Sequence, residues 1–163
     1  MIDRRAVAAL TLSAAGLVSL LQSEGYTSRA VIPIKGDVPT IGFGTTDGVK
    51  MGDTITPQAA VSRALSDVSK FEGAIKRCVK VPLTQGEYDA YLSLSYNIGS
   101  GAFCGSTLVR KLNAGDYAGA CEQVLVWDKS GGRRVQGLTA RRNRKDTACP
   151  ETYRQSLPVP RPN

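Results

Sequence analysis

Apolar residues recur with the spacing of a helix in the first part of the chain. Leu20 and Leu21 lie four and three positions before Glu24, and Ser13 stands where a helix N-cap is expected. Residues at these spacings share one face of a helix. The pattern predicts a helix over 14–24 that ends at Glu24, with the glutamate on the edge that faces the core.

The same region allows a second interpretation. Residues 6–21 are apolar and rich in Ala, Ser and Gly, and a basic flank precedes them, as in a weak signal or a releasable membrane anchor. The stretch is shorter than the roughly 20 residues that a stable membrane span needs. We favour the helix because it accounts for the position of Glu24. Transient membrane association of the N-terminal segment 1–12 stays open.

A longer helix is predicted over 57–80. Thr56 is a typical N-cap, and Pro57 fits the first helical position, where no backbone donor is needed. The buried face is predicted to hold the apolar residues that recur with helical spacing, namely Ala60, Ala64, Val68, Phe71 and Ile75. A helix of this length could connect two lobes.

Between these helices the pattern changes to that of a small β-hairpin unit, over 25–46. Apolar residues alternate with glycine in the run 40–46, which is typical of a strand with no bulk on one face. The Lys-Gly-Asp sequence at 35–37 is a turn signal. Because glycine lets another group approach the backbone closely, we expect Glu24 and the hydroxyl of Thr40 to lie near a surface that binds a ligand.

Shorter helices are predicted downstream. Pro82 ends the long helix, and Thr84 with Glu87 forms a capping box that begins the next one. A glycine-rich turn is expected over 97–105. Further helices are predicted over 106–113, 116–127 and 138–149, and the tail 150–163 holds four of the eight prolines.

These elements indicate an α+β fold class, mainly helical, with a small β-hairpin lobe and a long linking helix. A chain of 163 residues is expected to form one domain. We predict a single domain over 1–163, with an N-terminal segment at 1–12 and a proline-rich tail at 150–163. The content of 42% hydrophobic and 21% charged residues is that of an ordinary soluble globular protein.

Composition restricts the chemistry. The sequence has no His, which excludes His-based triads and nearly all usual zinc sites, and we predict neither a metal nor a cofactor. The net charge of +7 favours an anionic partner. Charge alone would allow a nucleic-acid binder, but no aromatic–basic interleaving or recognition-helix pattern accompanies it. We therefore expect no nucleic acid.

The four cysteines are scattered along the chain and form no C-x-x-C pair, so a metal knuckle or redox motif is not expected. They are compatible with two structural disulfides, hence with an oxidising compartment, or with free buried thiols. Of the three possible connectivities, we prefer the pairing of neighbours in sequence, Cys78 with Cys104 and Cys121 with Cys149.

Glu24 and Thr40 are the candidates for acid–base chemistry. The apolar residues before Glu24 could desolvate its carboxyl and keep it protonated, as a general acid requires. The hydroxyl of Thr40 could position a water. Taken singly, an exposed helix-end glutamate and an ordinary strand threonine are the commoner explanations of such residues. Only their joint spacing and the motifs downstream favour the catalytic interpretation.

Four motifs resemble those of phage-type lysozymes, the muramidases of glycoside hydrolase family 24. In the first, a Glu-Gly pair at 24–25 ends the first helix and a Thr-Ile-Gly-x-Gly hairpin follows at 40–44. The others lie, in the family order, at 85–90 with 96–103, at 106–116, and at 127–132 with 137–142. One motif would be weak evidence, but four in order from about residue 13 to about residue 149 are strong.

The resemblance implies a lysozyme-like fold with a cleft between the hairpin lobe and the helical lobe. It implies that Glu24 donates a proton to the leaving oxygen of a glycosidic bond and that Thr40 holds a water. Residues expected to bind substrate are Asn97, Gly99, Ser106, Thr107 and Arg142. The aromatic residues Tyr96, Phe103 and Trp127 are expected in the core rather than as sugar platforms.

The predicted hairpin departs from the family pattern. The family has a second carboxylate nine residues after the glutamate, where this chain has Pro33, and Thr40 lies one position further on than the family threonine. Asp37 is the only acidic residue between Glu24 and Thr40. It is a candidate for the second catalytic carboxylate, and a turn-forming residue bonded to its own backbone is the alternative.

The leading hypothesis is a phage or prophage endolysin that cleaves the β-1,4 bond between N-acetylmuramic acid and N-acetylglucosamine in bacterial peptidoglycan. We expect a monomer, made in the host cytoplasm and acting in the periplasm by an export route that the sequence does not specify. The alternatives are a catalytically inactive peptidoglycan-binding protein on the same scaffold and a lytic transglycosylase.

Overall fold

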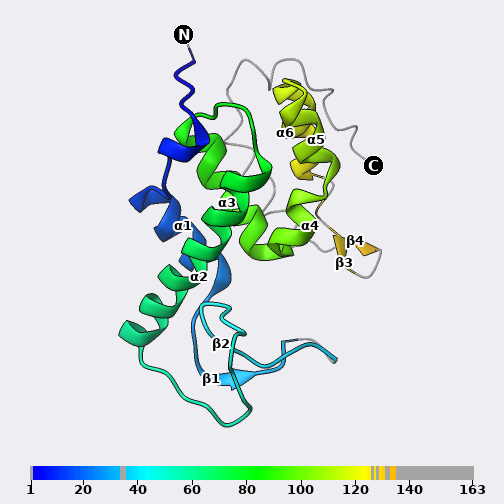
Figure 1. Cartoon of the computed structure of the whole chain (residues 1–163). Coiled ribbons are helices and arrows are strands. Elements are labelled where there is room, and N and C mark those ends of the chain that lie inside the picture. The colour runs from blue at the N-terminus through cyan, green and yellow to red at the C-terminus, as the bar shows by residue number, and fades with distance from the viewer. Residues whose placement is uncertain (1, 34–35, 126, 128, 131–132, 135–163) are drawn as a thin grey trace, which may run out of the picture.

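Helices dominate the structure, and a small hairpin forms a separate lobe (Figure 1). The computed structural model describes residues 2–33, 36–125, 127, 129–130 and 133–134. The elements are η1 (Val7–Ala9), α1 (Ala14–Glu24), β1 (Thr27–Val31), β2 (Thr40–Gly42), α2 (Pro57–Cys78), α3 (Gln85–Ile98), α4 (Ser100–Cys104), α5 (Thr107–Asn113), α6 (Tyr117–Leu125), β3 (Lys129–Ser130) and β4 (Arg133–Arg134). The predicted α+β fold class is confirmed.

Local side-chain caps begin the main helices where the sequence predicts them. The Ser13 hydroxyl accepts the Gly16 N–H at the start of α1, and Thr56 caps α2 ahead of Pro57. Thr84 begins α3 with a complete capping box. Each cap satisfies a backbone donor that the first helical turn would otherwise leave unpaired. The main difference is at the end of α2, which stops at Cys78 instead of continuing to residue 80.

The predicted hairpin is present as an antiparallel pair. Thr27 lies opposite Gly42 and Val31 opposite Thr40, with an irregular register between them. Just beyond β2, Ile41 and Thr45 exchange two backbone hydrogen bonds of 3.0 and 3.1 Å, which closes a tight turn over 42–44. The sequence interpretation of 40–46 as a strand followed by a tight turn is confirmed.

The prediction of an irregular turn over 97–105 is wrong in part. Residues 100–104 form the short helix α4. Its Phe103 is fully buried in the main core, and Cys104 forms a disulfide with Cys78 at the end of α2. These long-range contacts stabilise a helix that the glycine content of the segment disfavours.

The described residues form two hydrophobic cores, one in each lobe. The larger fills the helical lobe and includes Tyr88, Leu92 and Leu108, all fully buried. The smaller, in the hairpin lobe, consists of Ala30, Ile41 and Val49, with Ile55 packed against it. On the predicted buried face of α2, four of the five residues are buried and Phe71 is half-buried. The helix joins the two lobes, as predicted (Figure 1).

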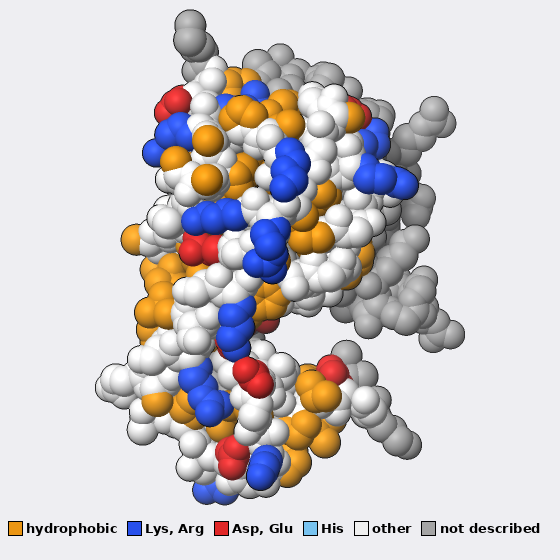
Figure 2. Space-filling model, in the orientation of Figure 1, with side chains coloured by type: hydrophobic (Ala, Val, Ile, Leu, Met, Phe, Trp, Pro, Cys, Tyr) orange, Lys and Arg blue, Asp and Glu red, His pale blue; other side chains and the backbone are white. Residues whose placement is uncertain are grey.

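The surface is hollowed between the two lobes. Figure 2 shows this hollow on the right-hand side of the view, with the helical lobe above it and the hairpin lobe below. Such a hollow between lobes is the usual position for a binding site.

Of the two predicted disulfides, the pair Cys78–Cys104 is present. Cys121 is also disulfide-bonded, and Cys149, its predicted partner, lies outside the described residues. The predicted final helix 138–149 and the tail 150–163 lie outside them as well.

The N-terminal segment packs against the helical lobe. Arg5 and Leu83 exchange two backbone hydrogen bonds of 2.8 and 2.9 Å. The Arg4 guanidinium donates to both oxygens of the buried Glu87 carboxylate, at 2.7 and 3.2 Å. The region predicted as a helix or a membrane anchor is helical over 14–24. Across the described part of the chain, no helix combines the length and the apolar character needed to cross a bilayer.

Candidate active site

Glu24 is the last residue of α1, and the chain turns away directly after it. Gly25 ends the helix with its N–H bonded to the Leu21 carbonyl, in a left-handed conformation (φ 71°). Glu24 is half-buried. Because strand β1 of the hairpin lobe begins three residues later, at Thr27, the glutamate lies at the junction of the two lobes.

The carboxyl of Glu24 lies against the tight turn of the hairpin. A Cβ atom at Gly44 would be 3.5 Å from Glu24 Oε2 and 3.6 Å from Tyr96 Cε1. Gly44 has a left-handed backbone conformation (φ 89°), which residues with a side chain rarely adopt. The glycine therefore lets the turn approach the acid and the tyrosine ring together.

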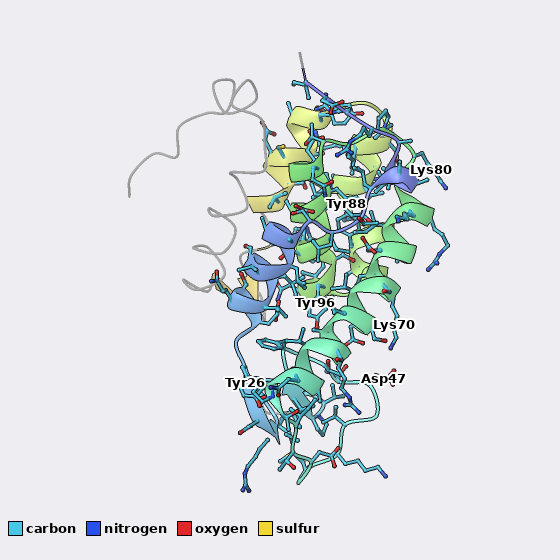
Figure 3. The ribbon with its side chains drawn as sticks, turned by 90° about the vertical axis from the view of Figure 1, so that its left-hand side faces the viewer. Tyr26, Asp47, Lys70, Lys80, Tyr88 and Tyr96 are labelled. Atoms are coloured by element: carbon cyan, nitrogen blue, oxygen red, sulfur yellow. A yellow bond between two sulfur atoms is a disulfide. The ribbon has the colours of Figure 1, made fainter. Side chains whose placement is uncertain are left out.

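Tyr96, from the last turn of α3, binds the same turn. Its hydroxyl donates to the Phe43 carbonyl at 3.0 Å, and its ring packs against Phe71 with centroids 5.1 Å apart. Figure 3 shows Tyr96 where the helical lobe meets the hairpin lobe. Burial, followed by the negative charges of Asp67 and Glu24, raises the pKa of the Tyr96 hydroxyl well above its ordinary value. The hydroxyl therefore keeps its proton at every pH of interest.

A second helix binds the turn one residue beyond Gly44. Thr45 is 4% exposed, and its hydroxyl donates to Asp67 Oδ2 of α2 at 2.7 Å. Asp67 also lies 3.4 Å from Lys70, which in turn contacts Asp47 at 3.0 Å (Figure 3). The turn is thus attached through Phe43 to α3 and through Thr45 to α2.

The two candidate residues of the hairpin, Asp37 and Thr40, precede the tight turn in the chain. Thr40 begins β2, is half-buried, and donates its hydroxyl proton to the Val38 carbonyl at 3.2 Å. At about 3.3 Å per residue, Thr40 lies within about 13 Å of Gly44 along the strand. Asp37 is exposed, and its Oδ1 accepts the Val38 N–H at 2.9 Å. That bond is the turn-forming contact considered for Asp37.

Four other predicted site residues lie at the end of α3 or at the start of α5. Asn97 is in its last turn, and Gly99 ends it. Ser106 is nearly buried, and its hydroxyl accepts the Val109 N–H as the N-cap of α5. Thr107 is exposed and accepts a hydrogen bond from Arg110 at 2.9 Å. Arg142 lies outside the described residues.

The sequence did not reveal the roles of Tyr96, Thr45 and Asp67 at this junction. Tyr96 was expected in the core, and its ring does pack against the main core. Its hydroxyl bonds to a carbonyl 53 positions away, which no local pattern indicates. The useful signal would have been that Tyr96 directly precedes the predicted site residue Asn97.

The arrangement is suited to proton transfer. The half-buried carboxyl of Glu24 lies beside the hairpin turn at the junction of two lobes, which is where a general acid would reach a bound polymer. Among the described residues, no cluster of three or more acidic or cysteine side chains could hold a metal ion.

Comparisons with known proteins agree with this geometry. A family model described as "Phage lysozyme" matches residues 21–145. The endolysin of Salmonella phage P22 is 40% identical over 127 residues, which cover 75% of this chain and 86% of that protein. The SAR-endolysin of Pseudomonas phage phiKMV is 38% identical over 152 residues, covering 91% of this chain and 92% of that protein. The solved structure of an endolysin from Escherichia coli O157:H7 phage FAHEc1 superposes with a TM-score of 0.75 at 37% identity, covering 88% of this chain and 96% of that chain.

Proposed function

This chain belongs to the phage lysozyme family and is a peptidoglycan hydrolase used for host cell lysis, and we propose that Glu24 is its proton donor. The enzyme cleaves the β-1,4 bond between N-acetylmuramic acid and N-acetylglucosamine. The observation that supports Glu24 is its position at the end of α1, half-buried and close enough to the hairpin turn that a Cβ atom at Gly44 would be 3.5 Å from its Oε2.

The proposed reaction has two parts. The Glu24 carboxyl protonates the oxygen that leaves the broken bond, and a water attacks the sugar carbon as positive charge develops there. Thr40 holds that water through its hydroxyl. Asp37 is the proposed second carboxylate and accepts the proton of the water. Asn97, Gly99, Ser106, Thr107 and Arg142 are the proposed substrate-binding residues.

Replacement of Glu24 tests the acid. Glu24→Gln keeps the size of the side chain but removes the transferable proton, so we expect kcat on purified sacculi to fall at least about 100-fold, as for other general acids. Glu122→Gln is the matched control, because Glu122 is exposed on α6. Release of reducing ends measures activity, and the thermal midpoint confirms folding. Full activity of folded Glu24→Gln would exclude the assignment.

Replacement of Asp37 tests the second carboxylate. Asp37→Asn retains an oxygen that can accept the Val38 N–H, but it cannot accept a proton from water, so we expect kcat to fall roughly 100-fold. Asp53→Asn is the control, because Asp53 accepts the backbone N–H of Lys50 at 2.9 Å in the same lobe. Equal kcat values for the two variants would leave the reaction to Glu24 and a water held by Thr40.

We further propose that the enzyme is a monomer, made in the host cytoplasm and active on peptidoglycan in the periplasm. Transient membrane association of the N-terminal segment belongs to the same proposal. Light scattering of the purified chain checks the first point, and fractionation of expressing cells into cytoplasm, membrane and periplasm checks the others.

A further inference from the structure

Hydrogen bonds to α2 and to α3 hold the tight turn beside Glu24. The Tyr96 hydroxyl donates to the Phe43 carbonyl at 3.0 Å, and the Thr45 hydroxyl donates to Asp67 at 2.7 Å. Between these two attachment points lies Gly44, where an added Cβ atom would be 3.5 Å from Glu24 Oε2. The position of the turn relative to the acid is therefore set by α2 and α3 as well as by the hairpin.

We propose that Tyr96 is a positioning residue for the reaction, whose hydrogen bond to Phe43 fixes the hairpin turn against the Glu24 carboxyl. This inference rests on the proposed function, because it takes Glu24 as the proton donor. Tyr96 does not exchange a proton with the substrate in this role. It acts through the backbone of 43–44 on the orientation of Glu24.

The contacts of Tyr96 suit this role on two counts. Its ring edge and Glu24 Oε2 converge on the same point above Gly44, at 3.6 and 3.5 Å, so a shift of the ring or the turn changes the space open to the carboxyl. Its hydroxyl, kept protonated by burial and by two nearby negative charges, is a permanent donor to the Phe43 carbonyl. A hydrogen bond of this kind restricts the peptide plane that leads into Gly44.

Loss of this bond should affect turnover more than binding. An acid displaced by about 1 Å can lose roughly 100-fold in rate, while the remaining substrate contacts are unchanged. For Tyr96→Phe, which keeps the ring and removes only the hydroxyl, we expect kcat on sacculi to fall about 10-fold and KM to stay within about twofold.

The chain offers a matched control on the same helix. The Tyr88 hydroxyl also makes one hydrogen bond, to Glu72 at 3.0 Å, and its ring is fully buried in the main core. Tyr88→Phe removes an equivalent bond away from the hairpin turn. We expect both variants to lose similar thermal stability, and only Tyr96→Phe to lose kcat.

The experiment measures kcat, KM and the thermal midpoint for the parent, Tyr96→Phe, Tyr88→Phe and Glu24→Gln. A kcat of Tyr96→Phe within twofold of the parent, or an equal loss of kcat in Tyr88→Phe, would overturn the inference. If Tyr96→Phe does not fold, Thr45→Val removes the second attachment of the same turn and should also lower kcat; full turnover in folded Thr45→Val overturns the inference too. An active Glu24→Gln would instead reject the proposed proton donor, so the two failures are distinguishable.

Discussion

Both the backbone conformation and the candidate site require a glycine at position 44. Its φ of 89° is strained for any residue with a side chain. Its Cα also faces Glu24 and Tyr96, where a methyl group would be in van der Waals contact with both. These distances are ordinary for a methyl group, so the contact itself costs little stability. We therefore expect the strained backbone to determine how much stability a substitution loses, and the added contact to determine how much activity it loses.

Gly44→Ala should therefore lower both stability and turnover. We expect a loss of about 1–2 kcal/mol in the free energy of unfolding from the strained backbone. We also expect a fall in kcat of about 10-fold, because the new methyl occupies the space on which the carboxyl and the tyrosine ring converge. Chemical denaturation and initial rates on sacculi measure the two effects.

Gly52→Ala is the comparison for that variant. Gly52 has a similar backbone (φ 99°), but apart from its chain neighbours no heavy atom of the described residues lies within 4 Å of the position of an added methyl. It should lose comparable stability and keep its kcat. Equal kcat in the two variants would show that the space above Gly44 has no part in catalysis.

At the scale of elements, helix starts were predictable because each depends on a few neighbouring residues. Ser13, Thr56 and Thr84 all form the caps expected of them, since a cap needs only a side chain and a backbone N–H two or three residues on. The helix α4 was missed because burial of Phe103 and the bond from Cys104 to α2 stabilise it, and neither contact is local.

In the candidate site, too, local features were predictable and contacts between distant parts of the chain were not. Glu24 and Thr40 were predicted from their spacing within one motif, and they lie at the end of α1 and the start of β2. The attachments of the turn were not found, because Tyr96 reaches a backbone carbonyl and Thr45 reaches a carboxylate 22 positions away. Because every residue has a backbone carbonyl, the sequence does not indicate which carbonyl a side chain will bind.

The disulfide between α2 and α4 gives a prediction at this scale. Cys78 and Cys104 are separated by 26 positions, and closing a loop of this size stabilises a fold by about 3 kcal/mol in the chain-entropy account. The double variant Cys78→Ala with Cys104→Ala should lose about this much in urea denaturation. An unchanged denaturation midpoint would show that packing of Phe103 alone maintains α4.

At the scale of the whole molecule, three carboxylates attach the N-terminal segment to the helical lobe. Glu87 binds Arg4, Glu72 accepts the Leu12 N–H at 2.7 Å, and Asp89 accepts the Ser13 N–H at 3.0 Å. The segment leads directly into α1, which carries Glu24. Its attachment therefore contributes to the position of Glu24, the proposed proton donor.

Arg4→Met tests that attachment. The Glu87 carboxylate is 1% exposed, and removal of its partner leaves a buried charge uncompensated, which typically costs about 3 kcal/mol or more. Arg4 also stacks on the Tyr117 ring at 3.7 Å. Arg5→Met is the control, because Arg5 is exposed and its guanidinium bonds to the neutral side chain of Gln85 at 3.3 Å. Thermal unfolding should separate the two variants by several degrees, and coincident midpoints would contradict the role given to Arg4.

The chain passes from the helical lobe into the hairpin lobe directly after Glu24, the proposed proton donor, and returns along α2 (Figure 1). A rotation of the hairpin lobe about these two crossings would carry Thr40 with it and leave Glu24 with α1. It would also strain the hydrogen bond from Tyr96 in the helical lobe to Phe43 in the hairpin lobe. Any opening of the hollow between the lobes would therefore change the separation of the two groups to which the proposed reaction assigns the proton and the water.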